Sequence, residues 1–127
     1  MHSYYHALSS VREWGGEPED YMPVHEFLDQ SKTAMADVRH RAILHHTVGT
    51  RLAEQCLGVT ITTSTGKKVP VRLIAEKHII EDLGFLPTPN DWLKCVSLKA
   101  IPWAGGHPKK LIRKGIPLAR SIRDKIS

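Results

Sequence analysis

The sequence predicts a mainly α fold, namely a compact helical domain with one inserted β-hairpin and a basic C-terminal tail. Apolar residues recur every three or four positions over most of the chain, which is the period of an α-helix. Near residues 59–72 the period changes to two, as in β-strands. The 127 residues, 41% of them hydrophobic and 24% charged, suffice to bury one core without disulfides. We therefore expect one domain over residues 1–106, followed by a tail at residues 107–127.

The first half of the chain is predicted to form three helices. A helix over residues 2–13 ends at Gly15 and Gly16, and an acidic turn follows it. The next helix is expected to have Pro23 at its first position, because proline is favoured there. The apolar spacing from Leu28 onward then predicts a long central helix over residues 31–57, which Gly58 ends.

The hairpin is predicted from two short runs of β-branched residues. Residues 59–63 and 69–72 have the alternation of strands, and the Ser-Thr-Gly-Lys segment between them is typical of a turn. Pro70 confines the second strand to an edge of the sheet, because proline has no backbone N–H to donate.

Two further helices are predicted after the hairpin. Residues 73–83 return to the helical period, and Gly84 ends that helix. A proline-rich loop follows, and a second helix is expected over residues 91–99. Pro102 and the Gly-Gly pair after it are expected to end the compact domain.

The positive charge of the protein is concentrated in its tail. Residues 107–127 carry seven basic residues and one acidic residue, a net charge of +6, whereas residues 1–106 carry eleven basic and twelve acidic residues, a net charge of −1. The neutral body does not have the basic surface of a dedicated nucleic-acid-binding domain. We expect the tail to bind nucleic acid or a host protein. The contact residues would be Lys109, Lys110, Arg113, Lys114, Arg120 and Arg123. A solvated tail that packs on its own domain remains an alternative, as does binding to a membrane surface.

Other features of the sequence point to a cytoplasmic protein. No apolar run is long enough to span a membrane, and the first twenty residues lack the apolar stretch of a signal peptide. Cys56 and Cys95 lack metal-type spacing, so we expect free core thiols in a reducing compartment. The apolar faces of two helices would suit a homodimer as well as closure within one chain.

Eight histidines in 127 residues are the one compositional excess. A single helix cannot direct neighbouring histidines to one point, so His45 and His46 would each contribute one ligand to a site completed elsewhere. His78 and Asp82 are four residues apart, so their side chains meet on one helical face and can share a transition metal. We predict a divalent metal site, for zinc, iron or manganese, formed by His45, His46, His78 and Asp82.

Other interpretations of the histidines remain open. His45 can equally be a hydrogen-bonded core residue while the other histidines are solvated or paired with acids. A metal-free acid–base role would instead use His45 or His46 with Glu76 or Asp82 as the orienting carboxylate. The N-terminal helices could add His2, His6 and His25 to any such site.

The basic residues around His40 suggest a place for an anion. Arg39 and Arg41 flank His40 and can hold a phosphate or carboxylate through charge-assisted hydrogen bonds, with Glu76 as a supporting residue. A charged, solvated helix face is the alternative interpretation.

The landmarks of the sequence resemble a family of small bacterial and phage proteins known only as a domain of unknown function. The resemblance spans roughly residues 3–95. Its main motifs are Arg-His-Arg-Ala at 39–42 with the histidine pair at 45–46, and Glu-Asp-Leu-Gly at 81–84. It implies a bacterial or phage origin. A looser similarity links residues 46–53 and 80–84 to the metal-binding helices of HD-type phosphohydrolases, with Glu81 in place of a histidine.

Small size and a segregated tail favour binding over catalysis as the function. We expect a phage or bacterial interaction protein whose histidine and carboxylate pocket binds an anionic ligand or a divalent metal. The alternative, which the looser similarity implies, is a metal-dependent phosphoester hydrolase.

Overall fold

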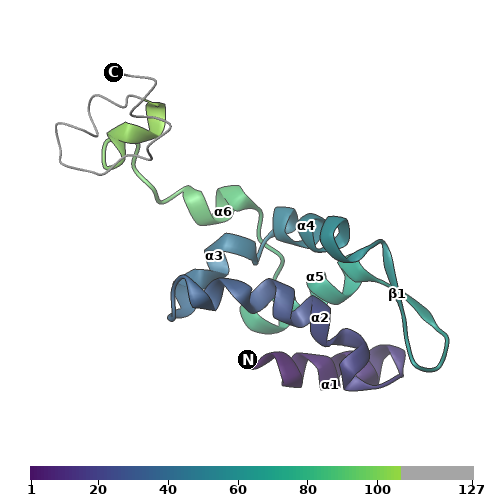
Figure 1. The fold of residues 1–127 in the computed structure, drawn as a ribbon. Helices are drawn as coiled ribbons and strands as arrows, with labels where there is room; N and C mark the ends of the chain where they lie inside the picture. The colour runs from purple at the N-terminus through teal and green to yellow at the C-terminus, as the bar shows by residue number, and fades with distance from the viewer. Residues whose placement is uncertain (107–127) are drawn as a thin grey trace. The chain divides into compact units, whose positions relative to one another are not determined.

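The protein is mainly helical and contains a two-stranded antiparallel hairpin, as predicted (Figure 1). The computed structural model describes residues 1–106, so the proposed contact residues of the tail lie outside the described part. The chain divides into a compact unit, Met1–Trp92, and a second unit that starts at Leu93. The boundary expected at residue 106 stays a prediction. No helix among the described residues combines the length and the hydropathy needed to cross a membrane.

The first unit starts with two helices that pack on each other, α1 (Ser3–Trp14) and α2 (Pro18–Asp29) (Figure 1). The expected start of the second helix at Pro23 is wrong. A capping box between Glu17 and Asp20, with Pro18 in the first turn, starts α2 five residues earlier. Pro23 is therefore inside the helix, where it lacks one backbone hydrogen bond.

The single central helix expected over residues 31–57 is also wrong, because the chain breaks three times there. It forms two 3₁₀ turns, η1 (Gln30–Thr33) and η2 (Val38–His40), then a short helix α3 (Arg41–Leu44) and a longer helix α4 (Thr47–Leu57). Side chains that bond to the backbone start the new segments: Asp37 accepts from the N–H of Arg39, and His46 accepts from the N–H of Gly49.

Glycine is required at position 49 by a close backbone approach. A Cβ on Gly49 would lie 1.6 Å from the carbonyl oxygen of Leu44. The absence of that atom lets α4 start directly against the end of α3, and His45 forms the link between them.

The hairpin and the following helix are close to their predicted positions. Strands β1 (Thr60–Thr62) and β2 (Lys68–Pro70) pair antiparallel, with Ile61 opposite Val69. Helix α5 (Val71–Leu83) starts two residues earlier than expected and ends at Gly84, as predicted. The helix expected over residues 91–99 is shorter, since α6 (Pro89–Leu93) ends at Leu93. In the second unit the described residues form the 3₁₀ turn η3 (Pro102–Gly105).

Helix α2 provides much of the apolar core and packs against α1, α4 and α5. Its buried Tyr21, Val24 and Leu28 share the core with Ile74 and Ile79 of α5. Polar side chains are buried in the same unit, including five fully or almost fully buried histidines: His6, His25, His40, His45 and His78. The free thiols of the two cysteines are exposed rather than packed in the core as expected.

Candidate metal centre

Four side chains from separate segments of the chain converge on one buried point. Asp29 ends α2, His45 links α3 to α4, and His78 and Asp82 lie on α5. Each offers one ligand atom, and the four atoms lie within 4.8 Å of one another. The histidine side chains are fully buried, and the carboxylates of Asp29 and Asp82 are only 7% and 2% exposed. These four residues are called the Asp–His cluster below.

The spacing within the Asp–His cluster matches that of ligands around a small metal ion. The Nε2 atom of His78 lies 3.3 Å from Asp29 Oδ1 and 3.4 Å from Asp82 Oδ2. The Nε2 atom of His45 lies 3.0 Å from Asp82 Oδ2 and 3.7 Å from Asp29 Oδ1. Ligands bonded at about 2.0–2.1 Å to a tetrahedral metal lie about 3.3–3.4 Å from one another. The cluster therefore has nearly the dimensions of an assembled site.

Local structure explains why these side chains meet. His78 and Asp82 are one helical turn apart on α5, so they project from the same face. His25 and Asp29 have the same spacing on α2. His45 is the cap residue at which α3 stops, and its carbonyl oxygen accepts a hydrogen bond from the indole N–H of Trp92 at 2.9 Å.

His6 of α1 holds the carboxylate of Asp82 from another side. Its Nε2 lies 3.1 Å from Asp82 Oδ1, and its Nδ1 lies 2.9 Å from Glu81 Oε1. The His6 ring stacks on the ring of His78 with a centroid distance of 3.7 Å. Asp82 Oδ1 also lies 3.2 Å from the amino group of Met1 and 3.7 Å from Arg41 Nη2. One oxygen of Asp82 thus faces the histidines of the cluster, and the other is held by groups around it.

His25 contacts the cluster through His78. Its Nδ1 lies 2.9 Å from His78 Nδ1, and its Nε2 lies 2.8 Å from the hydroxyl oxygen of Ser10. Asp29 is held in turn by Ser3, whose hydroxyl donates to Asp29 Oδ2 at 2.8 Å. The cluster is therefore surrounded by hydrogen-bonding groups from α1 and α2.

The surroundings keep the two carboxylates ionised and favour the neutral form of His25 and His45. Burial raises the pKa values of Asp29 and Asp82, but hydrogen bonds from the histidines outweigh it and leave both well below the usual value. Burial lowers the pKa of His25 to about 3, and it lowers that of His45 as well. For His78 the hydrogen bonds to the two carboxylates outweigh burial and raise the pKa. Ionised carboxylates and a neutral His45 are the forms that bind metal ions.

Two buried side-chain nitrogen atoms lack hydrogen-bond partners among the described residues, and both belong to this region. They are Nδ1 of His45 and Nε of Arg41. The Arg41 side chain is 21% exposed, and its Nη2 lies 3.7 Å from Asp82 Oδ1.

The structure brings together three of the four metal ligands predicted from the sequence, namely His45, His78 and Asp82. His46 is directed elsewhere: its Nε2 bonds to the carbonyl oxygen of Ile43 and its Nδ1 caps α4. Asp29 takes the fourth place, which sequence reasoning missed. The signal that could have found Asp29 is the His-x-x-x-Asp spacing, which occurs at 25–29 and again at 78–82.

The predicted anion-binding residues lie in different surroundings. Arg41 lies beside Asp82, but exposed Arg39 bonds to Asp37. His40 is buried, and its Nδ1 lies 3.1 Å from the hydroxyl oxygen of Ser31. Glu76 pairs with Arg72 on the surface of α5.

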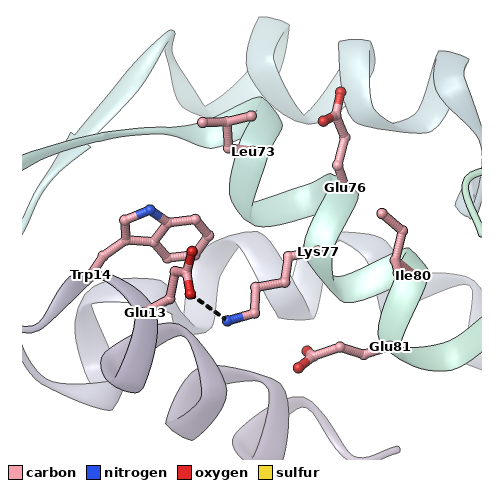
Figure 2. Close-up of a pocket in the computed structure, with 7 residues that line it drawn as sticks. All are labelled: Glu13, Trp14, Leu73, Glu76, Lys77, Ile80 and Glu81. Carbon is pink, nitrogen blue, oxygen red and sulfur yellow. Dashed lines mark ion pairs between the residues drawn. The ribbon is translucent and has the colours of Figure 1, made fainter. Parts of the chain in front are cut away.

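Glu76 also lines a groove of about 490 Å³ between α1 and α5 (Figure 2). Figure 2 shows Lys77 of α5 pointing toward Glu13 of α1, with Trp14 beside them. The nitrogen of Lys77 is 5.3 Å from the centroid of the Trp14 ring and 3.7 Å from Glu13 Oε2. None of the four residues of the Asp–His cluster lines this groove.

Comparison with known proteins identifies a family. No curated protein and no solved structure matches the chain significantly. Residues 1–104, which include every residue of the Asp–His cluster, match the family described as "domain of unknown function (DUF6915)". The chain belongs to this family.

Proposed function

We propose that this domain binds one divalent transition-metal ion through Asp29, His45, His78 and Asp82. The observation that carries the proposal is the convergence of four buried ligand atoms within 4.8 Å of one another, with nitrogen-to-oxygen distances of 3.0–3.7 Å. Two imidazoles and two carboxylates provide nitrogen and oxygen donors of intermediate hardness. Such a set suits zinc, iron or manganese.

A bound ion also accounts for the concentration of polar groups in the core. Ionised carboxylates are costly to bury unless they are paired or bind a metal. Asp29 and Asp82 both face the Nε2 atom of His78, so in the metal-free protein the two carboxylates compete for a hydrogen bond from one nitrogen. A divalent cation at the same place would neutralise both carboxylates, which supports a metal site over a purely hydrogen-bonded core.

Metal content and affinity test the proposal. Protein purified without chelators should contain about one equivalent of metal by mass spectrometry, and the metal-free protein should bind zinc in competition with a chromophoric chelator. Asp29→Asn should abolish this binding, because the amide removes the charge but keeps the shape. Asp37→Asn is the matched control, since Asp37 is exposed and bonds to Arg39. Zinc binding by Asp29→Asn with wild-type affinity and stoichiometry would reject the assignment.

A metal-dependent phosphoester hydrolase is the second candidate. One observation favours it: Arg41 lies next to Asp82 with a buried Nε that lacks a partner among the described residues. A guanidinium in that place suits a phosphate held beside the metal. Hydrolysis of a generic phosphoester by the zinc- or manganese-loaded protein, lost in Arg41→Ala with metal content unchanged, would support catalysis. Wild-type hydrolysis rates by Arg41→Ala would remove this argument for it.

The basic tail supports a further binding role in the full chain. Its net charge of +6 is separated from a body of net charge −1, which suits contact with nucleic acid or an acidic host protein. Nucleic-acid affinity should fall steeply with salt, because each neutralised phosphate releases counterions. Replacing Lys109, Lys110, Arg113 and Lys114 by glutamine should remove this binding and leave zinc binding unchanged.

The free thiols of the protein are consistent with a reducing, cytoplasmic location.

A further inference from the structure

A continuous chain of hydrogen-bonding groups leads away from the metal-facing imidazole of His78. His78 Nδ1 lies 2.9 Å from His25 Nδ1, and His25 Nε2 lies 2.8 Å from the hydroxyl oxygen of Ser10. The Ser10 hydroxyl donates to the backbone carbonyl oxygen of His6 at 3.1 Å. The chain therefore starts in the Asp–His cluster and ends on a carbonyl oxygen, which can only accept a hydrogen bond.

The carbonyl at the end of this chain sets the one direction in which all of its hydrogen bonds can form together. Ser10 uses its single hydroxyl proton on the carbonyl of His6, so its oxygen must accept from His25. His25 then carries its proton on Nε2 and has a lone pair on Nδ1. The nitrogen that faces this lone pair is His78 Nδ1, which must donate. The Nε2 atom of His78 is thereby left as the ligand atom toward Asp29 and Asp82.

Burial makes this direction persistent. Ser10 and His25 are each only 1% exposed, and His78 is fully buried. Water therefore does not compete for these hydrogen bonds. The rings of His25 and His78 are inclined by only 22°, with centroids 5.1 Å apart.

We infer that His25 is a positioning residue of the metal centre, which holds His78 in the tautomer and orientation that present Nε2 to the ion. This inference rests on the proposed metal-binding function. His25 does not contact the ion itself. It acts as the outer hydrogen-bond partner that metal-bound histidines generally require.

The same structure contains a natural contrast and a matched control. Nδ1 of His45, the other imidazole of the cluster, lacks a partner among the described residues, so His78 is the cluster imidazole whose outer nitrogen is held by a hydrogen bond. Ser31 and His40 form a second buried pair, with Ser31 Oγ 3.1 Å from His40 Nδ1. Ser31 also donates to the carbonyl oxygen of His40 at 3.0 Å. The His40 ring contacts the His45 ring edge-on, at a centroid distance of 5.7 Å, but no hydrogen bond joins the pair to a residue of the cluster.

The first test compares the two serines. Ser10→Ala leaves the Nε2–H of His25 without its acceptor, whereas Ser31→Ala removes an equivalent bond that leads to no ligand. The zinc dissociation constant should rise on the order of 10-fold in Ser10→Ala, as is typical when a residue that supports a metal ligand is changed. The zinc dissociation constant of Ser31→Ala should equal that of the wild type.

The second test reads the proton on His78 directly. In zinc-loaded wild-type protein, long-range ¹H–¹⁵N spectra should show His78 protonated at Nδ1 and His25 protonated at Nε2. His25→Leu should weaken zinc binding by more than Ser10→Ala does. His25→Asn, which can place an amide oxygen near the position of the imidazole Nδ1, should recover part of the affinity. A purely structural role of His25 would not produce that recovery.

The outcomes separate this inference from the function on which it rests. If wild-type protein binds no metal, the proposed function fails and the inference with it. If wild-type protein binds zinc, but Ser10→Ala and folded His25 variants bind it equally well, the inference alone is overturned. A proton found on Nε2 of His78 in the zinc-loaded protein would also overturn it.

Discussion

Asp82 and Asp29 approach the same nitrogen of His78 from two different helices, at 3.4 Å and 3.3 Å. The two carboxylates therefore share one imidazole. Asp82 also pairs with the amino group of Met1 and with Arg41, and Asp29 pairs with Lys32. Each is also held from its other side, Asp82 by His6 and Asp29 by Ser3. Substitution of either carboxylate removes a metal ligand, but it also removes a different set of hydrogen bonds. Its effect on metal affinity should therefore differ from its effect on the stability of the metal-free protein.

Asp82→Asn should weaken zinc binding by more than the roughly 10–100-fold that outer-shell changes typically cause. The amide keeps the size of the side chain but removes the charge that faces His45 and His78. Competition titration with a chelator measures the effect. Glu19→Gln, which changes an acid in the first turn of α2, should leave the affinity unchanged. Equal zinc affinities for Asp82→Asn and wild type would contradict the ligand role of Asp82.

Zinc should raise the thermal stability of the protein, because the ion binds only the folded state. At a free zinc concentration 100 times the dissociation constant, the gain is about 2.7 kcal/mol. For a domain of this size that corresponds to a rise in Tm on the order of 10 °C. Scanning calorimetry with and without zinc measures it, and a chelator should reverse it. An unchanged Tm at saturating zinc would be evidence against the site.

The metal-free protein should lose stability as the pH falls below about 6.5. His25 has a pKa of about 3 in the folded protein and of about 6.5 when unfolded. In this window the unfolded chain binds a proton that the folded protein excludes, so acid favours unfolding. Between pH 6.5 and 5 the loss is on the order of 2 kcal/mol. The lowered pKa values of Asp29 and Asp82 act in the same direction at lower pH.

His78 contributes with the opposite sign, because its pKa is raised. The contribution of His78 to the free energy of unfolding is present below about pH 6.5. It is lost as the pH rises through the pKa of His78 in the folded protein. Urea unfolding in the presence of a chelator, at several values between pH 8 and pH 4, tests both statements. A free energy of unfolding that stays constant from pH 6.5 to pH 5 would show that His25 is not held neutral by the fold.

Gly49→Ala should destabilise the protein by several kcal/mol or prevent folding. The new Cβ would lie 1.6 Å from the carbonyl oxygen of Leu44, so the junction of α3 and α4 would have to move. Urea unfolding measures the loss. Gln55→Ala, at an exposed position on α4, should change stability by no more than about 0.5 kcal/mol. Similar stabilities for the two variants would mean that the junction is free to relax.

The fold class could be predicted from the sequence because it depends on local periodicity. The hairpin and α5 follow from the alternation at residues 59–72 and the helical spacing after it, and Gly84 ends α5 as predicted. The central region could not be predicted in the same way. Its apolar spacing is helical, but Asp37 and His46 cap the backbone two and three residues further on and start new segments, and apolar periodicity does not reveal such side-chain caps.

The cluster was predictable only where two of its members share a helix. The spacing of His78 and Asp82 fixes their contact, whereas Asp29 joins them only because α2 packs against α5. The placement of His45 depends on the break after α3, which also turns His46 away to cap α4. Long-range packing of this kind leaves no periodic signal in the sequence.

The burial of so many polar side chains beside a small apolar core has a thermodynamic consequence. Exposure of apolar surface on unfolding raises the heat capacity, whereas exposure of polar surface lowers it. Besides Tyr21, Leu28, Ile74 and Ile79, the largest fully buried side chains include four histidines. The heat capacity change of unfolding should therefore be smaller than for an all-apolar core of equal size. The free energy of unfolding would then vary with temperature along a flatter curve, with less tendency toward cold denaturation.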